Sequence, residues 1–242
     1  MRHWKAAALT LAGICLYLCM FATIAYNRVT NHTIMLKGFY QFADTSLKGV
    51  PASAYPDYAA AITDYLKEKR DDLNVTAGDG SPREQFSEKE LTHMRDVRGI
   101  VQGLGAFRFI SGGLALALVG LYWARAWKKE SREQMARAIL GGMAAGAYLL
   151  LGVVLALALW GVFNFTGLFI TFHKVFFRND LWLLNPNRDL LIMLMPTRFF
   201  IWYARDIVFH CWPALAVMLA AMGAGATIKQ ERCRRERDDE LQ

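Results

Sequence analysis

Four long apolar runs, separated by charged segments, constrain this chain more than any other feature of its sequence. The runs cover residues 6–26, 100–124, 138–163 and 207–228. Each is long enough to cross about 30 Å of hydrocarbon as an α-helix, which takes about 20 residues. The sequence therefore predicts an all-α integral membrane protein with four transmembrane helices.

The first run follows Arg2 and Lys5, as the apolar part of a cleaved signal peptide also would. It is longer than the apolar region of a usual signal peptide. It also ends at Ala25-Tyr26-Asn27-Arg28, which lacks a small-x-small cleavage site. We therefore expect this run to remain in the membrane as an anchor.

The net charge of +7 comes largely from basic residues beside the ends of the runs. Lysine and arginine near membrane ends accumulate on the cytoplasmic side. The clusters lie at alternate ends and consist of Arg2 and Lys5, then Arg125, Lys128, Lys129, Arg132 and Arg137, then Lys229, Arg232, Arg234, Arg235 and Arg237. They predict a cell-membrane protein with cytoplasmic N- and C-termini, an extracellular cap and no nucleic-acid partner.

These observations divide the chain into eight segments. They are a first transmembrane helix with a cytoplasmic N-terminus (1–26), an extracellular cap (27–99), a second transmembrane helix (100–124), a cytoplasmic loop (125–137), a third transmembrane helix (138–163), an extracellular or interfacial aromatic segment (164–206), a fourth transmembrane helix (207–228) and a cytoplasmic tail (229–242).

The cap is predicted to be mostly helical. Apolar residues such as Tyr55, Tyr58 and Ile62 recur close to helical spacing, which favours an amphipathic helix. Ser87 and Glu90 form a capping box, in which each side chain accepts a hydrogen bond from the other residue's backbone N–H. The helix that starts there meets no proline before the second run, so we expect it to continue into the membrane.

Cysteine is absent from the outer segments, because the four cysteines are Cys15, Cys19, Cys211 and Cys233. A disulfide framework is therefore excluded there, and no cysteine and histidine spacing matches a zinc site. We expect neither a metal nor a cofactor.

Residues 169–200 are too charged to cross a bilayer and too aromatic to form a solvated loop, so we expect them to lie in the membrane interface. Within them, His173 can exchange a proton near neutral pH. His93 and Asp96, three residues apart on the capped helix, share a face, where the carboxylate can orient the imidazole. For His210 we expect a structural role.

Two blocks of sequence resemble a known family. Residues 90–97, ELTHMRDV, match the pattern E-x-x-H-x-x-D-V, and residues 172–177, FHKVFF, surround the second histidine. Eight further positions keep the family's spacing, namely Trp182, Pro186, Asp189, Leu191, Ile192, Pro196, Phe199 and Phe200. The chain thus resembles, over nearly its whole length, the bacterial lipoprotein intramolecular transacylase (Lit) family of four-span integral membrane proteins.

The resemblance implies an acyltransferase whose substrate is a diacylated lipoprotein. The acyl group would move from the sn-2 glyceryl ester to the α-amino group of the lipidated N-terminal cysteine, giving a lyso-form lipoprotein. The amine must lose a proton to attack, and the departing glyceryl oxygen must gain one. The resemblance maps the family's two functional histidines to His93 and His173, as general base and acid in an order that the sequence leaves open.

The remaining site residues would bind or orient the substrate. Asp96 is expected to orient His93, and Arg178 or Arg188 to stabilise an oxyanion or hold the substrate's backbone. An aromatic pocket would fold the flexible substrate into a ring, so that proximity supplies much of the catalysis. Its members are Phe172, Phe176, Phe177 and Trp182.

Two other functions fit parts of the sequence. A non-enzymatic envelope scaffold or lipid-binding module would need the aromatics and cations but no paired histidines. A metal-dependent membrane hydrolase would use His93, His173 and His210, although the chain lacks HExxH-like spacing. The sequence leaves the oligomeric state and the preferred lipoprotein and acyl chain open; membrane lipids are expected partners in every case.

The predicted topology can be tested by cysteine accessibility. Single cysteines at Ser46 and Asp79, in a chain without its native cysteines, should react with an impermeant thiol reagent on intact cells, because both lie in the predicted cap. A cysteine at Ser131, in the predicted cytoplasmic loop, should react only after permeabilisation. Protection of both cap positions in intact cells would overturn the topology.

Overall fold

The computed structural model describes residues 2–77 and 80–240. Side chains are described from Trp4 onward, and after residue 224 only in part. Several residues of the sequence analysis therefore lie outside the described side chains, namely Arg2, Asp79, Lys229, Arg232, Cys233 and Arg235.

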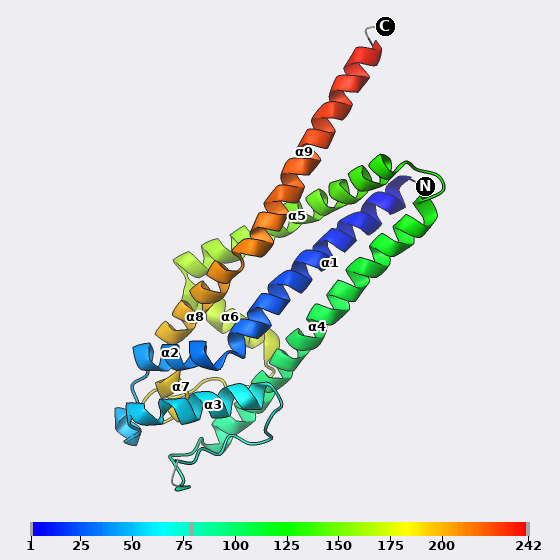
Figure 1. Ribbon diagram of the computed structural model, residues 1–242. Helices are drawn as coiled ribbons and strands as arrows, with labels where there is room; N and C mark the ends of the chain where they lie inside the picture. The colour runs from blue at the N-terminus through cyan, green and yellow to red at the C-terminus, as the bar shows by residue number, and fades with distance from the viewer. Residues whose placement is uncertain (1, 78–79, 241–242) are drawn as a thin grey trace. The chain divides into compact units, whose positions relative to one another are not determined.

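The prediction of an all-helical chain is confirmed, and no strand occurs in the described ranges (Figure 1). The α-helices are α1 (Arg2–Val29), α2 (His32–Phe42), α3 (Tyr55–Leu66), α4 (Glu88–Ala126), α5 (Arg132–Phe163), α6 (Phe165–Phe176), α7 (Leu190–Leu194), α8 (Thr197–His210) and α9 (Trp212–Glu240). Two 3-10 turns, Ser46–Lys48 and Ala52–Ala54, lie between α2 and α3.

Three of the described helices are long and apolar enough to cross a membrane: α1, α4 and α5. A fourth span arises only when α8 and the apolar part of α9 are taken together, because the helix is interrupted between them at Cys211. Pro213 lies just inside α9, and a proline there has no N–H to continue the hydrogen-bond ladder from α8. The fourth apolar run, residues 207–228, is therefore not one continuous helix, because it begins in the last turn of α8 and continues in α9.

The chain divides into two compact units, and α1 and α4 contribute to both. One unit holds Met1–Thr23, Phe107–Val162 and Cys211–Gln242, and the other holds Ile24–Ala106 and Phe163–His210. We call the first the helical bundle and the second the cap unit. The predicted cap and the predicted aromatic segment fall in the same unit.

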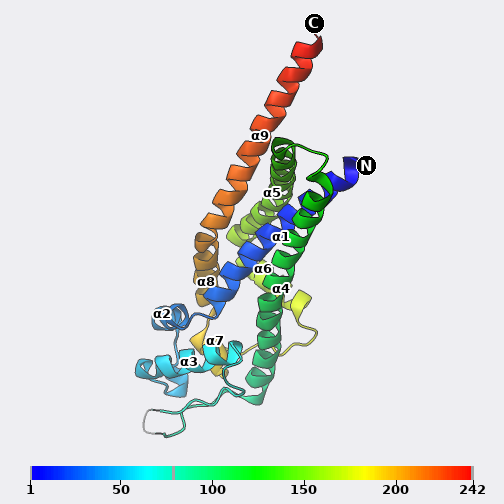
Figure 2. The ribbon, with the colours of Figure 1, turned by 45° about the vertical axis from the view of Figure 1, so that its right-hand side comes forward.

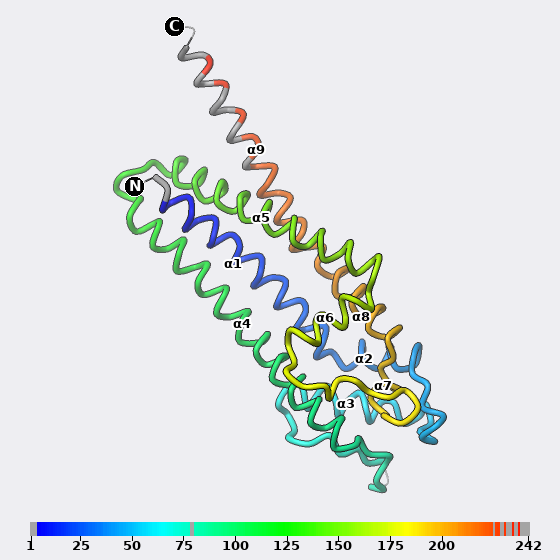
Figure 3. The backbone as a smooth tube through the Cα atoms, turned by 180° about the vertical axis from the view of Figure 1, so that it is seen from behind, coloured from blue at the N-terminus to red at the C-terminus, as the bar shows by residue number. Residues whose placement is uncertain are grey.

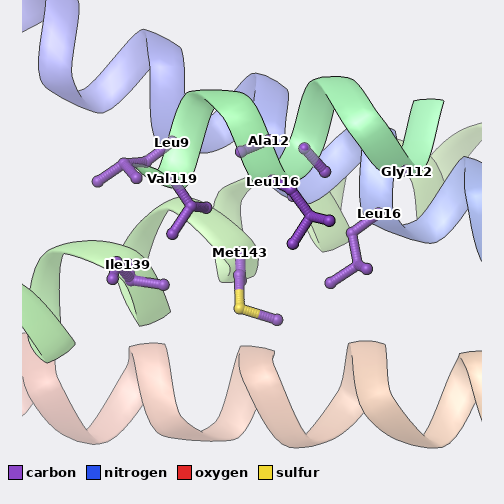
Figure 4. Close-up of a pocket in the computed structure, with 10 residues that line it drawn as sticks. Leu9, Ala12, Leu16, Gly112, Leu116, Val119, Ile139 and Met143 are labelled. Carbon is purple, nitrogen blue, oxygen red and sulfur yellow. The ribbon is translucent and has the colours of Figure 1, made fainter. Parts of the chain in front are cut away.

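Glycines let α1 and α5 approach closely in the helical bundle. A Cβ on Gly142 would clash with the Cβ of Leu9, and one on Gly146 would lie 2.9 Å from the backbone nitrogen of Ile14. The small residues therefore form a contact surface, as their four-residue spacing indicates. Beside this contact lies a wholly apolar pocket between α1, α4 and α5, whose lining includes Leu16, Leu116 and Met143 (Figure 4).

Neighbouring glycines test this contact. Gly142→Ala should lower the thermal unfolding midpoint of the detergent-solubilised protein, because the added methyl group meets Leu9. Gly141→Ala is the matched control, since a Cβ there meets no atom within 4 Å. Both substitutions replace a helical glycine with alanine and therefore raise the helix propensity of α5 equally. The control should thus be neutral or slightly stabilising. Equal midpoints for the two variants would contradict the close contact.

The cap unit has a core of its own, in which α2 packs against α3 and α8 (Figure 2). Its largest fully buried side chains include Phe39, Tyr58, Ile62 and Phe199. The amphipathic helix predicted from Tyr55 onward is confirmed as α3, and its apolar face supplies much of this core.

The predicted capping box begins α4. Ser87 donates to Glu90 through both its backbone N–H and its hydroxyl, each at 2.7 Å. The other carboxylate oxygen of Glu90 accepts the backbone N–H of Leu191 at 2.5 Å, and the side chain is 1% exposed. One buried carboxylate therefore joins the first turn of α4 to the first turn of α7.

An ion pair joins the end of α1 to α8. The Arg28 guanidinium donates from Nε and Nη2 to the two oxygens of Asp206, both at 2.7 Å. The Tyr203 hydroxyl adds a hydrogen bond to the Arg28 carbonyl at 2.8 Å. The next turn of α8 brings His210 beside the same carboxylate, with its Nδ1 on the Asp206 carbonyl oxygen at 2.8 Å.

Candidate active site

His93 and His173 lie side by side in the cap unit. His93 is in the second turn of α4, and His173 is near the end of α6. Their ring centroids are 6.1 Å apart, and the residues are 6% and 8% exposed. The structure therefore brings together the two histidines that the sequence singled out from segments eighty residues apart.

Aromatic rings enclose the pair. Phe177 contacts both imidazoles, with centroid distances of 5.1 Å to His93 and 5.3 Å to His173. Trp182 lies 4.9 Å and Phe172 lies 5.4 Å from His173. These three rings are among the four side chains that the sequence assigned to the substrate pocket.

Phe176 occupies a more peripheral position. It packs on Phe172 at 4.7 Å and is 54% exposed. Phe169 is instead the ring nearest to His173, with a centroid distance of 4.2 Å, and sequence reasoning did not assign it to the pocket. Its position four residues before His173 on one helix is the signal that identifies it.

Backbone hydrogen bonding fixes the tautomer of His173. Its Nδ1 lies 2.8 Å from the Phe169 carbonyl oxygen. A carbonyl only accepts, so Nδ1 carries a proton, and Nε2 of the neutral ring has a free lone pair. Burial lowers the pKa of His173, and the hydrogen bond to Phe169 partly opposes this shift.

His93 is more strongly perturbed. It precedes the apolar part of α4, which the sequence places from residue 100 onward. Burial, and then the neighbouring His173, lower the pKa of His93 to about 4. Its Nδ1 is buried, and it has no hydrogen-bond partner among the residues that the structure describes. Both imidazoles are therefore neutral at pH 7 and able to accept a proton.

The hydrogen bond that Asp96 accepts comes from Asn179, and none joins Asp96 to His93 in the described part of the chain. The Asp96 Oδ2 accepts this hydrogen bond from Asn179 Nδ2 at 2.9 Å, while none of the described residues is a partner for the Nδ1 of His93. Asn179 belongs to the segment after α6, which runs past the first turns of α4 (Figure 3). Nothing in the sequence identified Asn179, because its contact depends on how this irregular segment folds.

The two arginines assigned to substrate binding lie on the surface. Arg178 is exposed, and Arg188 donates to the buried Asp189 carboxylate at 3.4 Å while its own side chain is 72% exposed. Solvated guanidinium groups interact weakly with a charge that develops in a buried site. Their positions favour contact with a solvent-exposed part of a substrate over contact with an oxyanion.

No group of three histidine, cysteine, aspartate or glutamate side chains is arranged to hold a metal in the part of the chain that the structure describes. His210, the third ligand in the metal-dependent alternative, is instead engaged with Asp206 on its own helix.

The model of the lipoprotein intramolecular transacylase family matches residues 10–200, which is most of the chain and includes both histidines. This chain belongs to that family. Family membership makes it an acyltransferase, as the sequence motifs predicted. No curated protein matches the sequence.

Solved structures of the family confirm the fold. The membrane-integral lipoprotein intramolecular transacylase Lit from Bacillus cereus is 19% identical, with a TM-score of 0.65 over 100% of both chains. A variant of that protein with a histidine replaced by alanine aligns over 96% of both chains, at a TM-score of 0.65 and 19% identity. A third structure has arginine in place of a histidine, at a TM-score of 0.64 and 17% identity over 96% of this chain and 95% of that one.

The lowered histidine pKa values predict the acid limb of the pH profile. An imidazole that accepts a proton must be neutral, and a pKa below the ordinary value of about 6.5 keeps it neutral in weak acid. The acid-limb midpoint of kcat/KM for transacylation should therefore lie below pH 6.5, because an imidazole that is already protonated cannot act as a base. An acid-limb midpoint at or above about 6.5 would contradict the neutral pair.

Proposed function

We propose that this protein moves an acyl group within one diacylated lipoprotein. The group leaves the sn-2 glyceryl oxygen and joins the α-amino group of the lipidated N-terminal cysteine. The products are an N-acyl, S-monoacylglyceryl cysteine and a proton. The observation that carries this proposal is the pair of buried imidazoles 6.1 Å apart inside an aromatic enclosure, in a chain of the transacylase family.

Two proton movements are needed. The substrate's α-ammonium group gives a proton to one imidazole, and the free amine then attacks the ester carbonyl. As the C–O bond breaks, the nitrogen of the tetrahedral intermediate loses a second proton and the glyceryl oxygen gains one. The lone pair on Nε2 of His173 suits this step, because a neutral imidazole can accept the proton from nitrogen and return it to oxygen.

The aromatic enclosure supplies proximity. The amine and the ester belong to one flexible molecule and must be brought together into a medium-sized ring. Phe172, Phe177 and Trp182 are packed around the histidines and present rigid faces for the glyceryl part of the substrate. Phe176 extends this surface outward, where it would contact an acyl chain, and Arg178 and Arg188 would contact the polypeptide.

The membrane arrangement is part of the same proposal. The apolar helices α1, α4 and α5 and the broken pair of α8 and α9 would make four spans, with the cap unit on the extracellular face and both termini in the cytoplasm. Support comes from the length and hydropathy of these helices and from the basic loop between α4 and α5.

Histidine variants test the proposed reaction. His93→Ala and His173→Ala should each reduce lyso-form lipoprotein by about 100-fold or more, because each removes a proton-transfer group. His210→Ala should retain activity, since this histidine bonds to the backbone of its own helix. The measurement is the mass of N-terminal lipopeptides from cells expressing each variant at matched membrane abundance.

Near wild-type conversion by either of the first two variants would exclude the two-histidine mechanism. A wild-type protein that makes no N-acyl, S-monoacyl product would exclude the proposed reaction, and a scaffold or lipid-binding role would then replace it.

A further inference from the structure

The acceptor amine of the proposed reaction is a cation when it arrives. An α-amino group has an ordinary pKa of about 7.7 to 8.0, so at neutral pH most of the substrate carries an ammonium group. Moving that charge beside two neutral, buried imidazoles is costly unless a negative group compensates it. Electrostatics therefore requires an anion close to the pair.

Asp96 meets this requirement. It follows His93 by three residues in α4 and so projects from the same side of the helix. It is half-buried, between the enclosed histidines and solvent. Asn179 engages Oδ2 at 2.9 Å, and a carboxylate offers about four acceptor positions, so this bond leaves room for a further donor.

The histidine supplies a second and independent observation. The Nδ1 of His93 is buried, and the described residues provide it with no hydrogen-bond partner. Buried polar atoms without a partner are uncommon in folded proteins, and they point to a group that binds there. An ammonium group has three N–H donors, which is enough for one imidazole nitrogen and one carboxylate together.

The charges around His93 favour a cationic ligand. Asp96 is the acidic group whose charge acts on this imidazole, whereas Lys89 and His173 act in the opposite sense. The Lys89 ammonium is held 2.5 Å from the Leu183 carbonyl oxygen, so it is already directed at another acceptor. The carboxylate of Asp96 therefore remains available for an incoming cation.

We propose that Asp96 and the Nδ1 of His93 form a subsite for the α-ammonium group of the substrate, with Asn179 holding the carboxylate in place. This inference rests on the proposed function and adds the group that selects for a free amine. A lipoprotein whose amine is already acylated has no cation to place there, so the enzyme would discriminate against it. Binding at Nδ1 also places the proton of neutral His93 on Nε2.

Binding of two unreactive ligands tests the subsite without relying on turnover. Both are dialkyl-ether glyceryl cysteine peptides, which contain no acyl group that can move; one has a free α-amine and the other is N-acetylated. At pH 6 the wild type should bind the free amine about tenfold more tightly, which is the scale of one charge-assisted hydrogen bond. Dissociation constants are measured by thermophoresis in detergent micelles.

Three variants test whether the preference for the free amine depends on Asp96. Asp96→Asn should bring the two dissociation constants to within about twofold of each other. Glu88→Gln, an exposed acid in the first turn of the same helix, should keep the wild-type preference. Asn179→Ala removes the link to the carboxylate and should reduce the preference only in part. If Asp96 instead acted only by fastening the segment after α6, Asn179→Ala and Asp96→Asn would have equal effects.

The outcomes separate this subsite from the reaction itself. Equal binding of the two peptides by the wild type, or an unchanged preference in Asp96→Asn, would overturn the subsite even if the enzyme produces lyso-form lipoprotein. Failure of the wild type to bind either peptide would overturn the subsite and the proposed lipoprotein substrate together.

Discussion

The buried carboxylate of Glu90 is the interaction on which the geometry of the site depends. It accepts two hydrogen bonds from Ser87 and one from the Leu191 backbone, so it both starts α4 and fastens α4 to α7. A buried carboxylate is stable only when hydrogen bonds replace its lost hydration. His93 follows one turn later, and the segment that carries Phe177 and Trp182 ends where α7 begins. Glu90 thus sets the position of one histidine relative to the rings that cover the other.

Much of the fold follows from patterns that are local in the sequence. Apolar length predicted the long helices, the capping box predicted the start of α4, and the spacing of Tyr55, Tyr58 and Ile62 predicted α3. The small residues Gly142 and Gly146 indicated a close helix contact. The break at Cys211 was harder to predict, because a proline in a hydrophobic run is compatible with either a kink or an interruption.

The site was predicted in part. Both histidines and most of the enclosing aromatics came from motifs whose residues are close in sequence. The partners of Asp96 and Glu90 did not, since Asn179 and Leu191 reach α4 only through the irregular path of the segment between α6 and α7. Periodicity carries no information about such a path. The exposure of Arg178 and Arg188 likewise depends on this path.

The burial of both histidines also bears on which nucleophile takes the acyl group. Water at bulk concentration competes with the amine for any activated ester, and an open site with two basic imidazoles would release a free fatty acid. In the proposed reaction, the burial of His93 and His173, which are only 6% and 8% exposed and contact Phe177 and Trp182, would limit the access of water to the ester carbonyl. The rings proposed to fold the substrate would therefore also protect its acyl group from hydrolysis and keep the proposed reaction a transfer.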